Sequence, residues 1–164
     1  PVKRTALLAG RAAADTGLLT WNLVVTVAIG FLVGFRLHGD AAAGLAAFGL
    51  CVVYGFAFTW MFVCIGLVAG SAQAAQGMSL LVFPLTFVSS AYVPVDTMPS
   101  WLQPIAEHQP ITAMVDAVRC LTLGGPTAAG LTGSTSSYVL ASLVWSAGLV
   151  LVFAPLAVAR YRRG

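Results

Sequence analysis

The sequence predicts an all-α, polytopic membrane protein with four transmembrane helices. Of its 164 residues, 59% are apolar and 8% are charged, whereas about 25% of the residues in an average soluble domain are charged. The mean hydropathy of +0.93 points the same way. The charged residues also gather in groups that leave long charge-free stretches between them. This composition argues against a soluble enzyme, a nucleic-acid-binding domain and a disordered tail, so no nucleic-acid partner is expected.

The four spans follow from these charge-free stretches, because a charged group at the centre of a bilayer costs several kcal/mol. The stretch 41–95 is too long for one helix and divides at a small polar patch, 70–77. A loop rich in Gly, Thr and Ser precedes the last span, and a basic tail, 160–164, follows it. The expected spans are 17–35, 43–69, 78–95 and 138–159.

The distribution of basic residues predicts the orientation. Four spans leave both ends of the chain on one side, and each end carries three Lys or Arg residues, while the other side holds Arg36 and Arg119. The positive-inside rule then predicts that both ends are cytoplasmic. The chain opens on Pro1 rather than on a methionine, so we expect it to be the C-terminal part of a longer protein.

The segment 1–16 before the first span is expected to be cytoplasmic, with a short amphipathic helix over 2–16. Arg4, Arg11 and Asp15 fall on one face of this helix, beside Lys3 in the sequence. Two interpretations stay open at this point: a basic helix touching anionic lipid headgroups, or a docking helix for a cytoplasmic partner.

The segment 96–124, extracellular in this orientation, is expected to form a re-entrant or surface-lying helical hairpin, with an ordinary outer loop that carries a helical turn as the alternative. Pro94 and Pro99 rule out one continuous helix, and Trp101 suits an interfacial anchor at the start of a short helix. A second helix is predicted over 111–123 and ends at Gly124. It carries Asp116 and Arg119 as an i,i+3 pair, and Glu107 and Pro110 precede it.

Motifs for catalysis or cofactor binding are missing from the sequence. The only lysine is Lys3, so no P-loop is possible, and any ATP hydrolysis must take place on another chain. His38 and His108 stand alone, which makes a metal site improbable, and the three cysteines suit packing rather than disulfides. We therefore expect neither an enzyme nor a bound cofactor.

The third expected span contains a proline with hydroxyl residues after it. Pro84 is expected to bend this helix, because proline removes a backbone donor from the helix interior. Thr86, Ser89 and Ser90 follow it. A bent, hydroxyl-bearing helix is common along transport pathways, but plain helix packing explains the same residues equally well.

One part of the sequence resembles a known family. The run 83–104 (FPLTFVSSAYVPVDTMPSWLQP), followed by Glu107-His-Gln-Pro-Ile-Thr112 and Asp116-Ala-Val-Arg119, is similar to the type-2 ABC-exporter permeases, in particular their daunorubicin-resistance (DrrB-like) branch. Gly10-Arg11 and Asp15 ahead of a span add to the likeness, which extends over essentially the whole chain.

The resemblance implies a six-span permease in the bacterial cytoplasmic membrane, of which this chain is the last four spans. Such permeases pair with a separate P-loop ATPase, usually as two identical or paralogous permeases on two ATPases. By this likeness, Lys3, Arg4, Arg11 and Asp15 lie in the region that couples to the ATPase. Alternating access would then export a lipophilic drug or a lipid, because the expected spans carry no charge.

Other functions remain as alternatives. A non-transporting anchor or assembly subunit would share the spans and the basic ends, but would not need a coupling helix. Export of a polysaccharide is a second alternative. A secondary transporter ranks last, because ion coupling normally uses an ionisable residue within the spans, and the expected spans have none.

Overall fold

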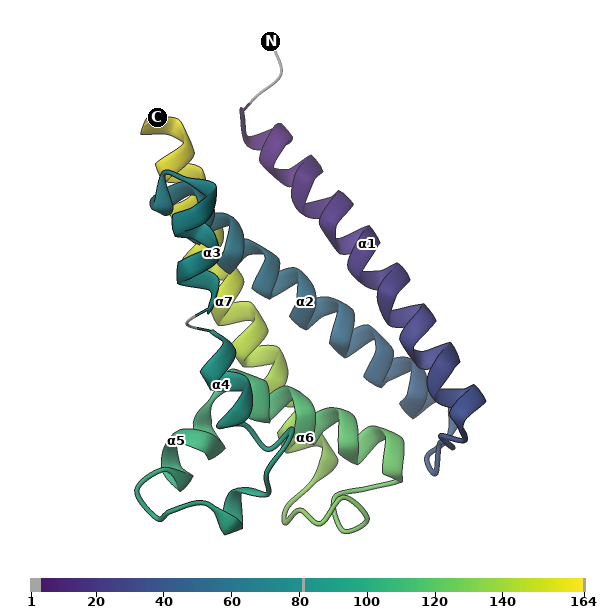
Figure 1. Ribbon diagram of the computed structural model, residues 1–164. Helices are drawn as coiled ribbons and strands as arrows, with labels where there is room; N and C mark the ends of the chain where they lie inside the picture. Colours follow the sequence, from purple (N-terminus) through teal and green to yellow (C-terminus); the bar gives the residue numbers. More distant parts are fainter. Residues whose placement is uncertain (1–3, 81, 164) are drawn as a thin grey trace.

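The computed structural model describes residues 4–80 and 82–163, and within these ranges the chain is helical, without strands (Figure 1). The helices are α1 (Arg4–Val33), α2 (Ala41–Ala69), α3 (Ala72–Leu80), α4 (Phe83–Phe87), the 3₁₀ helix η1 (Val95–Thr97), α5 (Gln103–His108), α6 (Pro110–Leu123) and α7 (Thr135–Arg163). The expected all-α fold class is confirmed. Three helices in the described ranges are long and apolar enough to cross a bilayer: Gly10–Val33, Ala41–Ala69 and Thr135–Tyr161.

Several hydroxyls in the long helices bond to a carbonyl of their own helix, which suits a lipid environment. In α1, the hydroxyls of Thr16, Thr20 and Thr26 each donate to the carbonyl four residues earlier, over 2.7 to 2.8 Å. At the start of α2, Asp40 Oδ1 accepts a 3.0 Å hydrogen bond from the Ala43 backbone N–H. Gly70 ends α2 in the left-handed conformation, which glycine adopts without strain.

Helices α2 and α7 form the centre of the molecule. The residues that α2 buries recur every three or four positions, which marks one face of a helix: Ala47, Leu50, Tyr54, Ala57, Trp60 and Cys64. Helix α7, against which α2 packs most extensively, buries Ser142, Ser146 and Ala157. Small residues on both helices let their backbones approach closely, as in many membrane proteins.

Figure 1 shows how the other elements lie around this pair. The two chain ends are at one end of the molecule, and α5 and α6 are at the other. Helix α1 lies beside α2, and its Ala12 belongs to a buried cluster with Trp60, Cys64 and Ala157. After α2 the chain turns back through α3 and α4 towards α6.

The expectation of a continuous third span over 78–95 is wrong. Helix α3 ends at Leu80, α4 covers only Phe83–Phe87, and the chain continues in turns from residue 88. Pro84 lies in the first turn of α4, where its missing N–H breaks no helical hydrogen bond. Proline alone does not account for the interruption, because α7 continues through Pro155. The proline was expected to bend this helix, and instead it lies at the start of a new short helix after the interruption.

The expected boundary between an entry helix and the first span is also wrong, since α1 is one continuous helix. Gly17 is tolerated inside it, and the Thr16 hydroxyl bonds within the helix. Lys3 lies outside the described residues.

Other boundaries shift by a few residues. Of the patch 70–77, expected to connect two spans, only residues 70–71 leave the helix, and α3 begins at Ala72. The basic tail extends α7 as far as Arg163. The expected helix start near Trp101 is a turn, in which the Pro99 carbonyl accepts from two later N–H groups, and α5 begins at Gln103. The helix expected over 111–123 is found as α6, with Gly124 as its left-handed C-cap.

Candidate functional site

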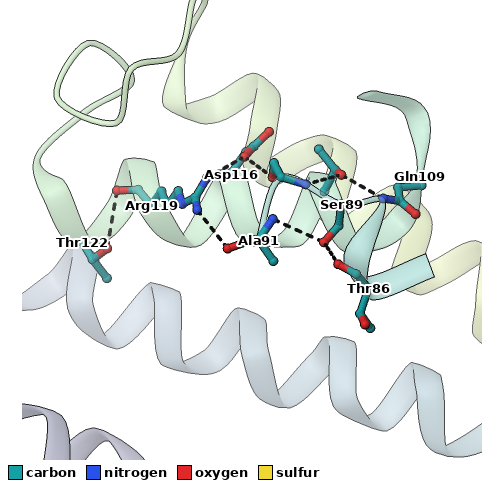
Figure 2. A network of polar contacts seen from close by, with 9 residues as sticks. Thr86, Ser89, Ala91, Gln109, Asp116, Arg119 and Thr122 are labelled. Atoms are coloured by element: carbon teal, nitrogen blue, oxygen red, sulfur yellow. Dashed lines mark hydrogen bonds and ion pairs between the residues drawn. The ribbon is translucent and has the colours of Figure 1, made fainter. Parts of the chain in front are cut away.

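A cluster of buried polar groups joins the interrupted helix to α6. We call it the polar junction: Ser90, Ala91, Thr112, Asp116 and Arg119 (Figure 2). The Ser90 hydroxyl donates to Asp116 Oδ1 over 2.7 Å, and the Ser90 backbone N–H donates to Thr112 Oγ1 over 3.2 Å. Arg119 Nη2 donates to the Ala91 carbonyl over 3.4 Å, while its Nη1 lies 3.9 Å from Asp116 Oδ1.

The junction is shielded from solvent on the Asp116 side. Ser90, Thr112 and Asp116 are buried, and the Arg119 side chain is 38% exposed. Burial raises the pKa of the Asp116 carboxyl, while the hydrogen bond from Ser90 and the charge of Arg119 oppose that rise. Desolvation is the largest of the three effects. The carboxylate therefore depends on Ser90 and Arg119 for compensation.

The turn after α4 is shaped by its own hydroxyls. Ser89 Oγ donates to the Thr86 carbonyl over 2.5 Å and accepts from the Ala91 N–H over 3.3 Å. The Val88 N–H donates to the Pro84 carbonyl over 3.2 Å. These bonds satisfy backbone groups that would otherwise be unpaired where the helix ends. In the resulting turn, the Ser90 side chain faces α6.

On the α6 side, Thr112 and Gln109 complete the junction. Gln109 Nε2 donates to Thr112 Oγ1 over 3.3 Å, so this hydroxyl oxygen accepts from both Gln109 and Ser90. Sequence reasoning assigned no role to either residue. Thr112 lies four residues before Asp116 and so on the same helix face, and this spacing could have signalled it.

A second contact ties α6 to the loop between α1 and α2. The N–H groups of His38 and Gly39 both donate to the Thr122 carbonyl, over 3.0 and 3.4 Å. A Cβ at Gly39 would lie 2.7 Å from the Leu121 carbonyl oxygen, so only glycine fits without a shift. Gly124, the C-cap of α6 with φ of +90°, also lies close to this loop. A Cβ there would be 3.2 Å from the His38 carbonyl oxygen.

The structure brings together some of the predicted site residues. Ser90, Asp116 and Arg119 meet at the junction although up to 29 positions separate them in the sequence, and Ser89 lies in the turn beside it. Pro84 and Thr86 lie one turn before it, in α4. The other hairpin residues lie outside it: Pro94 precedes η1, Pro99 and Trp101 belong to the following turn, Glu107 is exposed on α5, and Pro110 begins α6.

The predicted coupling residues that the structure describes, Arg4, Arg11 and Asp15, lie at the far end of the molecule from the junction. Arg4 begins α1, and Arg11 Nε lies 3.8 Å from Asp15 Oδ2 in a solvent-exposed i,i+4 pair. Pairs of this kind contribute little to stability. Across the described residues, no three His, Cys, Asp or Glu side chains gather as a metal site would need.

Three helices that are long and apolar enough to cross a bilayer are typical of a polytopic membrane protein. Residues 1–122 match the ABC-2 type transporter family, and the chain belongs to this family.

Two curated relatives cover nearly the whole chain. The daunorubicin resistance ABC transporter permease protein DrrB1 of Streptomyces coeruleorubidus is 35% identical over 99% of this chain and 55% of its own length. The probable doxorubicin resistance ABC transporter permease protein DrrC of Mycobacterium tuberculosis (strain CDC 1551 / Oshkosh) is 30% identical over 99% of this chain and 56% of its own length. The chain thus spans about half the length of these relatives. No solved structure matches it. The family resemblance is confirmed, and the relatives are permeases, in agreement with a chain that is not an ATPase.

Proposed function

We propose that the chain is part of the membrane permease of an ATP-driven exporter, which moves a lipophilic drug or lipid out across the bacterial cytoplasmic membrane. The observation that carries this proposal is the match of 99% of the chain to permease proteins of drug-resistance ABC transporters. A separate P-loop ATPase supplies the energy. A second permease copy or a paralogue completes the transporter.

In this proposal the interrupted helix, α3 with α4, crosses the membrane between α2 and α7 in addition to the three long helices, and both ends of the chain are cytoplasmic. The grouping of Lys and Arg near the two ends supports the orientation. Figure 1 agrees with both ends lying on one side of the membrane, because the start of α1 and the end of α7 are at one end of the molecule and α5 and α6 are at the other. Irregular backbone at membrane depth is tolerated when it is packed on protein, and the junction with α6 supplies that packing.

Helix α1 would carry the signal from the ATPase. It is continuous for 30 residues, about 45 Å at 1.5 Å per residue. Lys3, Arg4, Arg11 and Asp15 provide charges for docking at its cytoplasmic end. The loop after its other end is hydrogen-bonded to α6 through the Thr122 carbonyl. A displacement of α1 would therefore reach α6 and, through the junction, the interrupted helix, as alternating access requires.

The test is co-purification of the full-length protein with its P-loop ATPase, followed by ATP hydrolysis in lipid vesicles. The parent complex should hydrolyse ATP, and Arg4→Glu with Arg11→Glu should release the ATPase. Arg36→Glu is the matched control, because Arg36 lies just beyond the other end of α1. A permease that purifies alone under gentle conditions would favour an anchoring subunit.

The cargo is tested separately, in cells that express the full-length permease with its ATPase. Protection against an anthracycline-like drug would support drug export. If the cells are not protected although the ATPase is active, the proposed cargo becomes a lipid, and after that a polysaccharide.

A further inference from the structure

An apolar cavity of about 630 Å³ lies between α1, α2 and α6. Val27 and Phe31 line it from α1, Leu45, Phe48 and Cys51 from α2, and Val118 from α6. We call it the chamber. Its volume falls within the range of about 300–1,000 Å³ that is usual for sites of drug-sized ligands.

The chamber is closed at the end where α6 lies. There the loop after α1 contributes Leu37, whose side chain packs so tightly on α2 that a Cβ at Gly44 would lie 2.9 Å from Leu37 Cδ1. The hydrogen bonds of the same loop to the Thr122 carbonyl hold it on α6. Further along the two helices, Leu19 packs against Gly55, where a Cβ would lie 2.5 Å from Leu19 Cδ1. Access is therefore sideways, from the surface where the helices of this chain face the bilayer.

The lining of the chamber selects against charge. None of its lining residues is ionised at neutral pH, and the Thr122 hydroxyl already donates to the Val118 carbonyl over 2.8 Å. A charged group inside would lose its hydration without gaining a partner, which is strongly unfavourable. An uncharged ring system or hydrocarbon segment gains by leaving water and pays no such cost.

We infer that the chamber binds the uncharged apolar portion of the lipophilic molecule that the permease exports, and that this molecule leaves between α1 and α2 into the half of the bilayer next to α6. This inference rests on the proposed function, because the occupant is taken to be the cargo. Any charged or hydrogen-bonding part of the cargo then stays outside, towards the headgroups.

Cys51 makes the inference testable. It is a half-buried lining residue, whereas Cys64 and Cys120 are buried, with 8% and 1% exposed. The full-length permease with its ATPase, in lipid nanodiscs, is labelled with N-ethylmaleimide at mildly alkaline pH, because the thiolate is the reactive form. The probe is the uncharged aromatic dye N-phenyl-1-naphthylamine. Cys51→Ser identifies the signal that belongs to this residue.

The dye should slow the labelling of Cys51 about tenfold at about ten times its dissociation constant, since only the empty chamber reacts. Val27→Trp should fill the chamber and slow labelling without dye. Val25→Trp is the matched control, because Val25 is exposed on α1 and does not line the chamber. Equal labelling with and without dye would overturn the inference. So would a Cys51 that reacts in dispersed permease but not in the assembled exporter, because protein would then cover the chamber. Equal protection by added bilayer phospholipid would overturn it too, because the occupant would then be an ordinary acyl chain.

ATP-driven dye export from inside-out vesicles separates this inference from the proposed function. Export that persists in Val27→Trp shows that the chamber is not the cargo site while the exporter function stands. If the parent exports neither the dye nor any other lipophile tested, the proposed function fails. Labelling of Cys51 then still shows whether the chamber binds lipophilic molecules, but the chamber can no longer be called a cargo site.

Discussion

Replacing Ser90 by alanine removes the hydroxyl that donates to Asp116 Oδ1 over 2.7 Å. Hydrogen bonds to charged groups contribute about 1.5–3 kcal/mol, and a buried acceptor left without its donor stays desolvated. The remaining partner, Arg119, lies 3.9 Å from the same oxygen and is partly exposed, so its attraction is screened. Ser90→Ala should therefore lower the free energy of unfolding by about 2 kcal/mol. The apparent melting temperature should fall by about 4–8 °C at most, which is the shift for about 150–250 residues and an upper bound for the longer full-length permease.

The assay is thermal unfolding of the purified full-length permease in detergent, at one scan rate. Ser146→Ala is the matched control, because Ser146 is also buried but its hydroxyl donates within its own helix, to the Ser142 carbonyl. A double-mutant cycle with Asp116→Ala isolates the cross-element bond, and its coupling energy should reach about 1.5–3 kcal/mol. The reasoning is refuted if Ser90→Ala and Ser146→Ala behave alike and the coupling stays below about 0.5 kcal/mol.

Three further changes test the neighbouring features by the same melting assay or by hydrogen exchange. Because burial raises the pKa of Asp116, its stabilising contribution is present at acid pH and is lost as the pH rises through the folded-state pKa. Asp116→Asn should flatten the fall in melting temperature as the pH rises above the ordinary pKa of a carboxyl, about 4, and an unchanged slope would contradict this. Gly39→Ala should lower the free energy of unfolding by about 1–3 kcal/mol, because the new Cβ would meet the Leu121 carbonyl. Gly49 has open space around it, so Gly49→Ala should leave that free energy unchanged or raise it by up to about 1 kcal/mol. Equal effects of the two substitutions would argue against the close packing of the loop. Pro84→Ala restores a backbone donor and should slow amide exchange over residues 83–88, and an unaltered rate would mean that the proline does not contribute to the interruption of the helix.

The long helices could be predicted from the sequence because their signal is local. Charge-free apolar stretches cover most of α1, α2 and α7, and lipid penalises charge wherever the segment packs. The end of α6 was equally local, since Gly124 supplies the left-handed cap that stops a helix.

The polar junction could not be predicted, because its two sides are distant in the sequence. Ser90 and Asp116 are 26 positions apart, and no local sequence pattern at either residue indicates that the two are in contact. The fate of the third span was undetermined for the same reason. Pro84 predicts a disturbed helix, but whether the helix bends or ends depends on what receives the freed backbone groups. Here Thr112 accepts from the Ser90 N–H, so ending the helix leaves that donor satisfied.

The continuity of α1 shows a different limit of reading charge along a sequence. The boundary at 16/17 was drawn where the charged residues stop, but charge reports on the solvent around a helix and not on its backbone hydrogen bonds. Ala12 is buried with Trp60, Cys64 and Ala157, so α1 is already packed on α2 and α7 within the segment that was expected to be a separate helix. A separate entry helix could move without displacing the span behind it. A continuous helix cannot, and so charges at its first turns act on the same rigid body whose other end leads into the loop hydrogen-bonded to α6.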